Sequence, residues 1–208
     1  MLPLERTSPI RTFPTYQGKR SYSGAFYSAP VAGHVVFESL FERAVLMSLE
    51  VDDQVVSLAA QPLLLRWPGG GRQWHVPDFF VRLSTGQGRL MDARPRERIT
   101  ERAARLFEAT RQVCEQAELE YEVVSDLSWA TQANLGFLSN FRDRDFAPSA
   151  TVASLRGWRG TVGELAALLS PLDPAAGFGS VYWMLWCGRA RTDLAIMLSS
   201  STPVEVVR

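Results

Sequence analysis

Two carboxylates and a guanidinium lie beside two short apolar segments, and these three groups could do chemistry together. Asp78 follows Val76 and Pro77, whereas Asp92 follows a second apolar segment and precedes Arg94 by two residues. Side chains two apart on a strand point to the same face, so Asp92 and Arg94 should face one site. Carboxylates bind Mg²⁺ or Mn²⁺, and such an ion can promote the hydrolysis of a phosphodiester. The spacing therefore predicts metal-dependent phosphodiester cleavage.

A set of oxygen ligands for this ion can be predicted from the same part of the chain. Asp78, Asp92 and the carbonyl oxygen of Ala93 are expected to bind it, and Glu42 would complete the set from a helix. Glu38 lies four residues before Glu42 on the same helical face, which makes it the second choice for this position. The alternative for both glutamates is a solvated helix face.

The remaining candidates also have structural alternatives. Asp78 could cap the turn after Pro77, although the apolar residues around it make a lone carboxylate costly to place there. Asp92 and Arg94 could form an outward-facing pair on an exposed strand. His75, two residues before Pro77, is an additional candidate for the site, but a single histidine is more often structural or exposed.

Apolar periodicity and turn residues predict the elements that position these groups. The expected order is helix, strands, helix, strand, and the last strand should lie parallel to the Asp92 strand through a helical crossover. This order gives a mixed α/β core. The predicted helices span residues 36–50 and 99–118, and the predicted strands span residues 55–65, 73–83, 89–93 and 121–124, with a glycine-rich turn at 67–73.

Residues 1–33 have no sustained periodicity and are predicted to form an extended N-terminal arm. Arg11, Lys19 and Arg20 lie among several aromatic residues, so this arm could contact a phosphate backbone and stack on bases. The alternative is an arm packed along the surface of the protein itself, because aromatic residues at this density usually become buried.

The rest of the chain divides into a core at residues 34–142, a linker at 143–150 and a smaller unit at 151–208. A short helix at 135–142 closes the core. Thr161 and Glu164 have the spacing of a capping box, which predicts a helix over 161–169. A further helix at 179–188 and a β-hairpin at 192–207 suggest a winged helix-turn-helix.

Composition sets limits on the class of protein. Hydrophobic residues make up 46% of the chain and charged residues 21%, which predicts a packed core. The 22 basic and 22 acidic residues cancel, so any contact with DNA must come from local patches or through a partner. The two cysteines give neither a disulfide framework nor a zinc spacing, and no segment has the length of a signal peptide or membrane span. We expect a cytoplasmic protein.

Four segments together resemble the TnsA-like endonuclease subunits of heteromeric transposases. The family pattern has an acidic helix, a Gln-Pro after the next strand, a strand with Pro-Asp-Phe or Thr-Asp-Phe, and a strand with an acidic or Gln residue, any residue, Lys and Pro. The resemblance covers about residues 31–141. The matching segments are 37–43, Gln61-Pro62, 76–79 and 91–95, in which Arg94 replaces the usual lysine.

This resemblance implies a restriction-endonuclease-like core with a PD-(D/E)xK site, a mixed sheet flanked by helices and a small C-terminal winged-helix domain. It assigns catalytic positions to Glu42, Asp78, Asp92 and Arg94, with Gln61 as an additional site residue. It also implies Mg²⁺ or Mn²⁺ as cofactor and nicking of the 5′ strand at transposon ends. The implied partners are DNA, a DDE-type transposase subunit and an AAA+ ATPase that contacts the C-terminal unit.

Arg94 leaves two other functions open. Arginine keeps the positive charge, but its planar fork does not mimic a compact ammonium group. One alternative is a catalytically weakened nuclease-fold adaptor that binds DNA and transposition partners. The other is a stand-alone restriction or defence nuclease with the same core.

Overall fold

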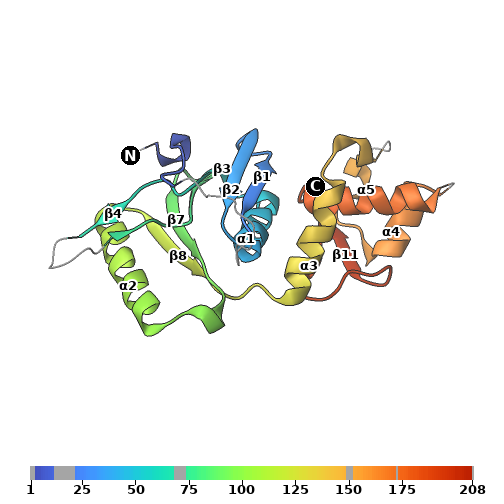
Figure 1. Cartoon of the computed structure of the whole chain (residues 1–208). Coiled ribbons are helices and arrows are strands. Elements are labelled where there is room, and N and C mark those ends of the chain that lie inside the picture. The colour runs from blue at the N-terminus through green and yellow to red at the C-terminus, as the bar shows by residue number, and fades with distance from the viewer. Residues whose placement is uncertain (1–2, 12–21, 68–73, 149–151, 172, 208) are drawn as a thin grey trace. The chain divides into compact units, whose positions relative to one another are not determined.

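The computed structural model describes residues 3–11, 22–67, 74–148, 152–171 and 173–207, and it divides into two units (Figure 1). These units are Met1–Leu127 and Ser128–Arg208. The sequence places residues 128–142 in the core, whereas the structure groups them with the second unit. The reason is visible at Asn134, whose side-chain amide donates hydrogen bonds to the carbonyl oxygens of Leu194 and Ile196.

The first unit is built on a mixed four-stranded sheet. Its strands lie in the order β3, β6, β7, β8, and only β7 and β8 are parallel. The mixed α/β class expected from the sequence is therefore confirmed. The strands are β3 (Val55–Ala60), β6 (Phe79–Leu83), β7 (Gly88–Ala93) and β8 (Glu120–Val124).

Helix α2 (Glu101–Gln116) makes the predicted crossover between β7 and β8. It begins after Thr100, whose hydroxyl accepts a hydrogen bond from the Ala103 N–H at 3.2 Å. Figure 1 shows α2 and α1 (Leu40–Val51) on opposite sides of β7 and β8. On the α2 side, Cys114 packs with Phe80 and Leu90 in a buried cluster. The two helices thus cover the sheet that carries Asp92.

Helix α1 begins at Leu40, not at residue 36 as predicted. Ser39 caps it, because the Glu42 N–H donates a hydrogen bond to the Ser39 hydroxyl at 3.2 Å. Residues 36 and 37 belong to strand β2 (Gly33–Phe37), which pairs antiparallel with β1 (Gly24–Ser28). This hairpin corrects the prediction of an extended arm through residue 33.

The described start of the chain packs on the first unit. Leu4, in a short 3₁₀ turn at Leu4–Arg6, is buried in the cluster on the α2 side of the sheet. Glu5 accepts a hydrogen bond from the Arg82 guanidinium at 2.8 Å. For this segment the structure supports the alternative of an arm packed on its own protein. Lys19 and Arg20 lie outside the described residues.

Two short strands lead into the site. β4 (Leu65–Arg66) and β5 (Trp74–His75) pair antiparallel, with Arg66 opposite Trp74. Residues 68–73, which make up most of the predicted glycine-rich turn at 67–73, lie outside the described residues. Trp74 and His75 thus lie on a short paired strand shortly before Asp78 in the chain.

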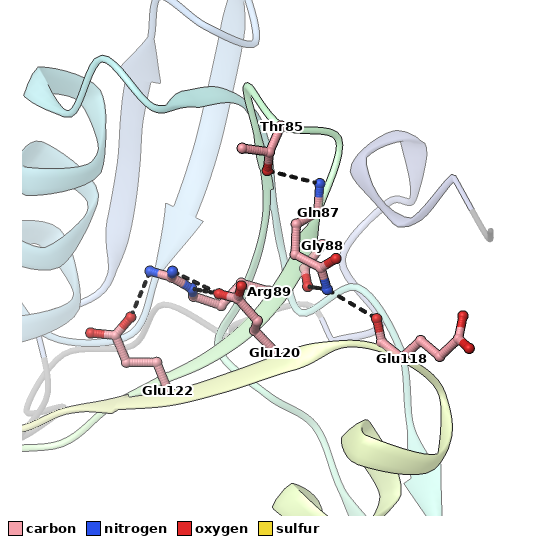
Figure 2. Close-up of polar contacts among 7 residues, drawn as sticks. All are labelled: Thr85, Gln87, Gly88, Arg89, Glu118, Glu120 and Glu122. Atoms are coloured by element: carbon pink, nitrogen blue, oxygen red, sulfur yellow. Dashed lines mark hydrogen bonds and ion pairs between the residues drawn. The ribbon is translucent and has the colours of Figure 1, made fainter.

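Ion pairs fix the register of the parallel strands at the end of β7 away from Asp92. Figure 2 shows Arg89 reaching from β7 to Glu120 and Glu122 on β8. The Arg89 guanidinium donates to the Glu120 and Glu122 carboxylates at 2.7 and 2.9 Å. Asp92 then lies opposite Val123. A forked arginine is suited to holding two carboxylates at once.

The described residues of the second unit form three α-helices and a three-stranded sheet in the order β10, β11, β9. The capping box at Thr161 and Glu164 is confirmed at the start of α4. The prediction of a hairpin over 192–207 is corrected, because residues 192–202 form no strand and residues 205–206 pair instead with 190–191, which precede the predicted range. Its elements are α3 (Trp129–Leu138), β9 (Arg159–Thr161), α4 (Val162–Leu169), α5 (Pro174–Trp186), β10 (Ala190–Arg191) and β11 (Pro203–Val206), with 3₁₀ turns at Ser139–Phe141, Arg144–Phe146 and Val152–Leu155. In the first unit, Arg96–Arg98 forms another such turn.

Candidate functional site

A pocket of about 440 Å³ gathers most of the predicted site residues in the first unit. It lies where β7 ends and where the chain enters β6, and the start of α1 also contributes to it. Such a volume is within the range of small-ligand sites in proteins. Its charged and polar lining consists of Glu38, Glu42, Asp78, Asp92, His75, Arg11, Arg94 and Arg102.

Asp78 is held at the edge of the sheet by two backbone contacts. Its Oδ2 accepts a hydrogen bond from the Ala93 N–H at 2.8 Å, and its carbonyl oxygen accepts one from the Gln61 N–H at the same distance. Burial raises the pKa of Asp78 well above its usual value, and the charges of Asp92 and Glu42 raise it further. These carboxylates therefore repel one another across the pocket.

Asp92 is buried and belongs to a small polar network. Its Oδ2 lies 2.8 Å from His75 Nε2 and also accepts a hydrogen bond from the Tyr121 hydroxyl. Burial and the charge of Asp92 raise the pKa of Tyr121, so this phenol keeps its proton at neutral pH and donates it. With a side chain only 5% exposed, Asp92 does not fit the alternative of an outward-facing strand pair.

Glu42 has a structural role at the start of α1. Its Oε2 accepts a hydrogen bond from the Glu38 N–H at 2.6 Å, and its Oε1 accepts one from the Ser39 hydroxyl at 2.9 Å. A carboxylate that closes the first turn of a helix also interacts favourably with the helix dipole. Burial raises the pKa of Glu42, and the nearby charge of Glu38 acts in the same direction.

Gln61 connects several of these groups from an unusual backbone position. Its φ of 47° lies in the left-handed region, which is uncommon for a residue other than glycine. Its amide Nε2 donates to Glu38 Oε1 at 2.7 Å, and its Oε1 accepts from the Arg11 N–H at 3.3 Å. Backbone strain of this kind persists where the surrounding contacts hold it in place, and it is concentrated at functional sites.

The arginines around the pocket differ in their partners. Arg11 pairs with Glu38 at 3.6 Å. Arg94 follows the end of β7, its N–H donates to the Val124 carbonyl at 2.9 Å, and its side chain is exposed. Among the described residues, Arg94 and Arg102 have no ion-pair partner. These two guanidinium groups are therefore available to an anion at the pocket.

The donors around the pocket are hard oxygens, which fit Mg²⁺ or Mn²⁺ in kind. The mutual repulsion that raises the pKa of Asp78 is also what a bound cation would relieve. Within the described ranges, however, no three acidic, histidine or cysteine side chains are close enough together to hold an ion. Hydrogen bonds occupy both carboxylate oxygens of Glu42 and the Oδ2 of Asp92.

Many of the residues that line the pocket are predicted from the sequence, but several of their contacts are not. Glu38, Glu42, Asp78, Asp92 and Arg94 all line the pocket, together with Ala93, His75 and Arg11. Gln61 lies behind it and holds Glu38. The contact of Tyr121 with Asp92, and the contributions of Trp74 and Arg102, were not predicted. The capping of α1 was signalled by the Ser39 to Glu42 spacing, which matches a capping box.

No protein-family model matches the chain, and no curated protein matches it. Within the described residues, no helix has the length and apolar character needed to cross a membrane.

Proposed function

We propose that the chain is a metal-dependent DNA endonuclease that acts as a subunit of a heteromeric transposase and nicks transposon ends. The observation that carries this proposal is the convergence of four carboxylates and Arg94 on one pocket at the end of a mixed sheet. The order of the motifs along the chain supports the same function. On this proposal the first unit is a restriction-endonuclease-like core, and the second is a winged-helix domain.

In this function Asp78, Asp92 and the Ala93 carbonyl would hold Mg²⁺ or Mn²⁺, with Glu42 as a further ligand. The ion would lower the pKa of a bound water and would place positive charge near the scissile phosphate. The chain itself orients these groups: the Ala93 N–H fixes Asp78, while His75 and Tyr121 fix Asp92. Arg94 would bind the phosphate, because its guanidinium is exposed beside the carboxylates.

The neutral net charge is consistent with a subunit that reaches DNA with the help of partners. By resemblance, these are a DDE-type transposase subunit and an AAA+ ATPase, the latter contacting the second unit. The same resemblance is the basis for proposing that the nick is made in the 5′ strand.

Nicking of supercoiled plasmid in Mg²⁺ and in Mn²⁺ tests this function, first with the chain alone and then with the two partner proteins added. Asp78→Asn keeps an oxygen that can accept from Ala93 but removes the charge, and we expect nicking to fall by about 100-fold or more. Glu118→Gln is the matched control, because Glu118 is exposed and does not line the pocket. Nicking by the Asp78 variant at the wild-type rate would contradict the proposal.

A second candidate function is an adaptor that keeps the nuclease fold but cleaves weakly or not at all. The hydrogen bonds that occupy Glu42 and Asp92 favour it, because these oxygens would have to change partners to bind an ion. Arg94→Lys separates the two functions. Increased nicking would show an enzyme slowed by its arginine, whereas no nicking by either form in the complete complex would favour the adaptor.

A further inference from the structure

A second pocket of about 550 Å³ opens beside the carboxylate pocket. Trp74, Arg94, Arg102 and Leu106 line both pockets, so the two pockets adjoin. Among the described residues, none that lines the second pocket is acidic, whereas four that line the first are. A ligand that spans both would place an anionic or aromatic part in the second pocket and a reacting group beside the carboxylates.

Aromatic side chains form part of this pocket. Trp74 is on β5 and is 47% exposed, and Trp67 follows the paired strand β4. The backbone of Trp74 is thus held by a short paired strand, while much of its side chain remains accessible. An exposed indole on a fixed backbone is suited to stack on a nucleobase, because every base presents a π face.

Cationic side chains form another part of it. Arg94 comes from the end of β7, while Arg102 and Arg105 come from the first two turns of α2. The Arg105 guanidinium forms an ion pair with Glu101 at 3.6 Å, whereas the side chains of Arg94 and Arg102 form no ion pair with a described residue. Guanidinium groups bind phosphate through two parallel hydrogen bonds. The pocket therefore combines a stacking surface with two available phosphate-binding groups.

We propose that this pocket binds a nucleotide of an unpaired DNA strand next to the bond that is cut. The base would stack on Trp74, and the adjoining phosphates would contact Arg94 and Arg102. A base within a duplex is stacked on both faces and must leave the stack before it can enter a pocket, which costs least when the nucleotide is already unpaired. The choice of DNA as ligand rests on the proposed nuclease function. The pocket would then select ends at which the strands are already separated.

Fluorescence anisotropy of labelled oligonucleotides tests this inference on the full chain in EDTA, where no metal-dependent cleavage occurs. The probes are single-stranded dT12, a 12-base-pair duplex and the RNA strand U12. We expect dT12 to bind more tightly than the duplex. Trp74→Ala should weaken dT12 binding by about tenfold or more, Trp74→Phe should restore most of it, and Arg102→Glu should weaken it and flatten its salt dependence.

Matched controls come from the second unit. Trp129 is 74% exposed and Arg144 is exposed, and neither lines either pocket. Trp129→Ala and Arg144→Glu should therefore bind dT12 like the wild type. Thermal melting confirms that each variant is folded, and Trp74→Phe keeps an aromatic ring if the alanine variant is destabilised.

The inference is overturned if dT12 binds no more tightly than the duplex, if Trp74→Ala and Arg102→Glu bind like the wild type, or if U12 binds more tightly than dT12. These outcomes are separate from the outcome for the nuclease. Loss of nicking in Asp78→Asn with normal dT12 binding in Trp74→Ala would keep the nuclease and reject the pocket. Binding of dT12 that depends on Trp74 in a chain that never nicks would keep the pocket and reject the nuclease.

Discussion

The hydrogen bond from Tyr121 to Asp92 gives a direct test of the polar network behind the pocket. Tyr121→Phe removes one hydroxyl and leaves the ring in place. The ring packs against the cluster of Leu4, Phe80, Leu90 and Cys114, and the Arg111 guanidinium lies over it at 5.6 Å. Phenylalanine can keep both contacts, so the substitution isolates the loss of a donor to a buried carboxylate.

The size of the effect follows from the partners of Asp92. A hydrogen bond to a charged group contributes about 1.5–3 kcal/mol to stability. His75 still contacts the same carboxylate oxygen in the variant, so Asp92 keeps one partner and the lower part of this range applies. We expect a loss of about 2 kcal/mol. For a unit of roughly this size, that corresponds to a fall in Tm of about 6–10 °C.

Urea unfolding and calorimetry of the full chain measure this change, and the transition that shifts identifies the first unit. Tyr22→Phe is the control, because Tyr22 is 72% exposed and its hydroxyl should contribute little. If the Tyr121 variant is as stable as the Tyr22 variant, the buried Asp92 carboxylate does not depend on this donor and the prediction is wrong.

Two further predictions concern a charge in the first unit and a buried amide in the second. Because the pKa of Asp78 is raised in the folded chain, ionisation of Asp78 costs stability as the pH rises above about 4, the value for an unfolded aspartate. Asp78→Asn should therefore gain stability relative to the wild type as the pH rises from 4.5 to 8, and equal differences in urea unfolding at the two pH values would contradict this. Asn134 donates to the Leu194 and Ile196 carbonyls and accepts from the Leu198 N–H, so Asn134→Ala should lose about 2–4 kcal/mol in the same assay. Asn140→Ala, which removes only exposed contacts, is its control, and a similar loss in both variants would show that the buried amide has no special role.

Local signals predicted much of the sheet and its helices. The apolar stripe of α2 and the short strand after it led to the parallel pairing of β8 with β7, because crossovers of this kind follow a strong topological rule. The capping box at Thr161 fixed the start of α4. In contrast, the β1 and β2 hairpin was missed, since glycines and exposed aromatics obscured the alternation in which Phe26 and Val35 are buried.

The site shows the same division between local and distant information. Residues such as Asp78 and Asp92 could be chosen from chemistry and strand position. Their partners could not, because the Tyr121 hydroxyl is 29 residues from Asp92 in sequence and the Gln61 side chain is 23 residues from Glu38. Such contacts depend on how strands and helices pack, and no local pattern encodes them. No local pattern indicated that Arg11 forms an ion pair whereas Arg94 and Arg102 form none with the described residues.

The most direct test of the proposed nuclease is crystallography of the chain with Mn²⁺, using the anomalous signal of manganese. We expect one ion bound by Asp78 and by at least one of Asp92, Glu42 and the Ala93 carbonyl, because carboxylate and carbonyl oxygens are the ligands that such hard cations prefer. Asp92 or Glu42 would have exchanged a hydrogen bond for the metal. The absence of manganese from the pocket at saturating Mn²⁺, with these hydrogen bonds unchanged, would argue against a metal-dependent nuclease.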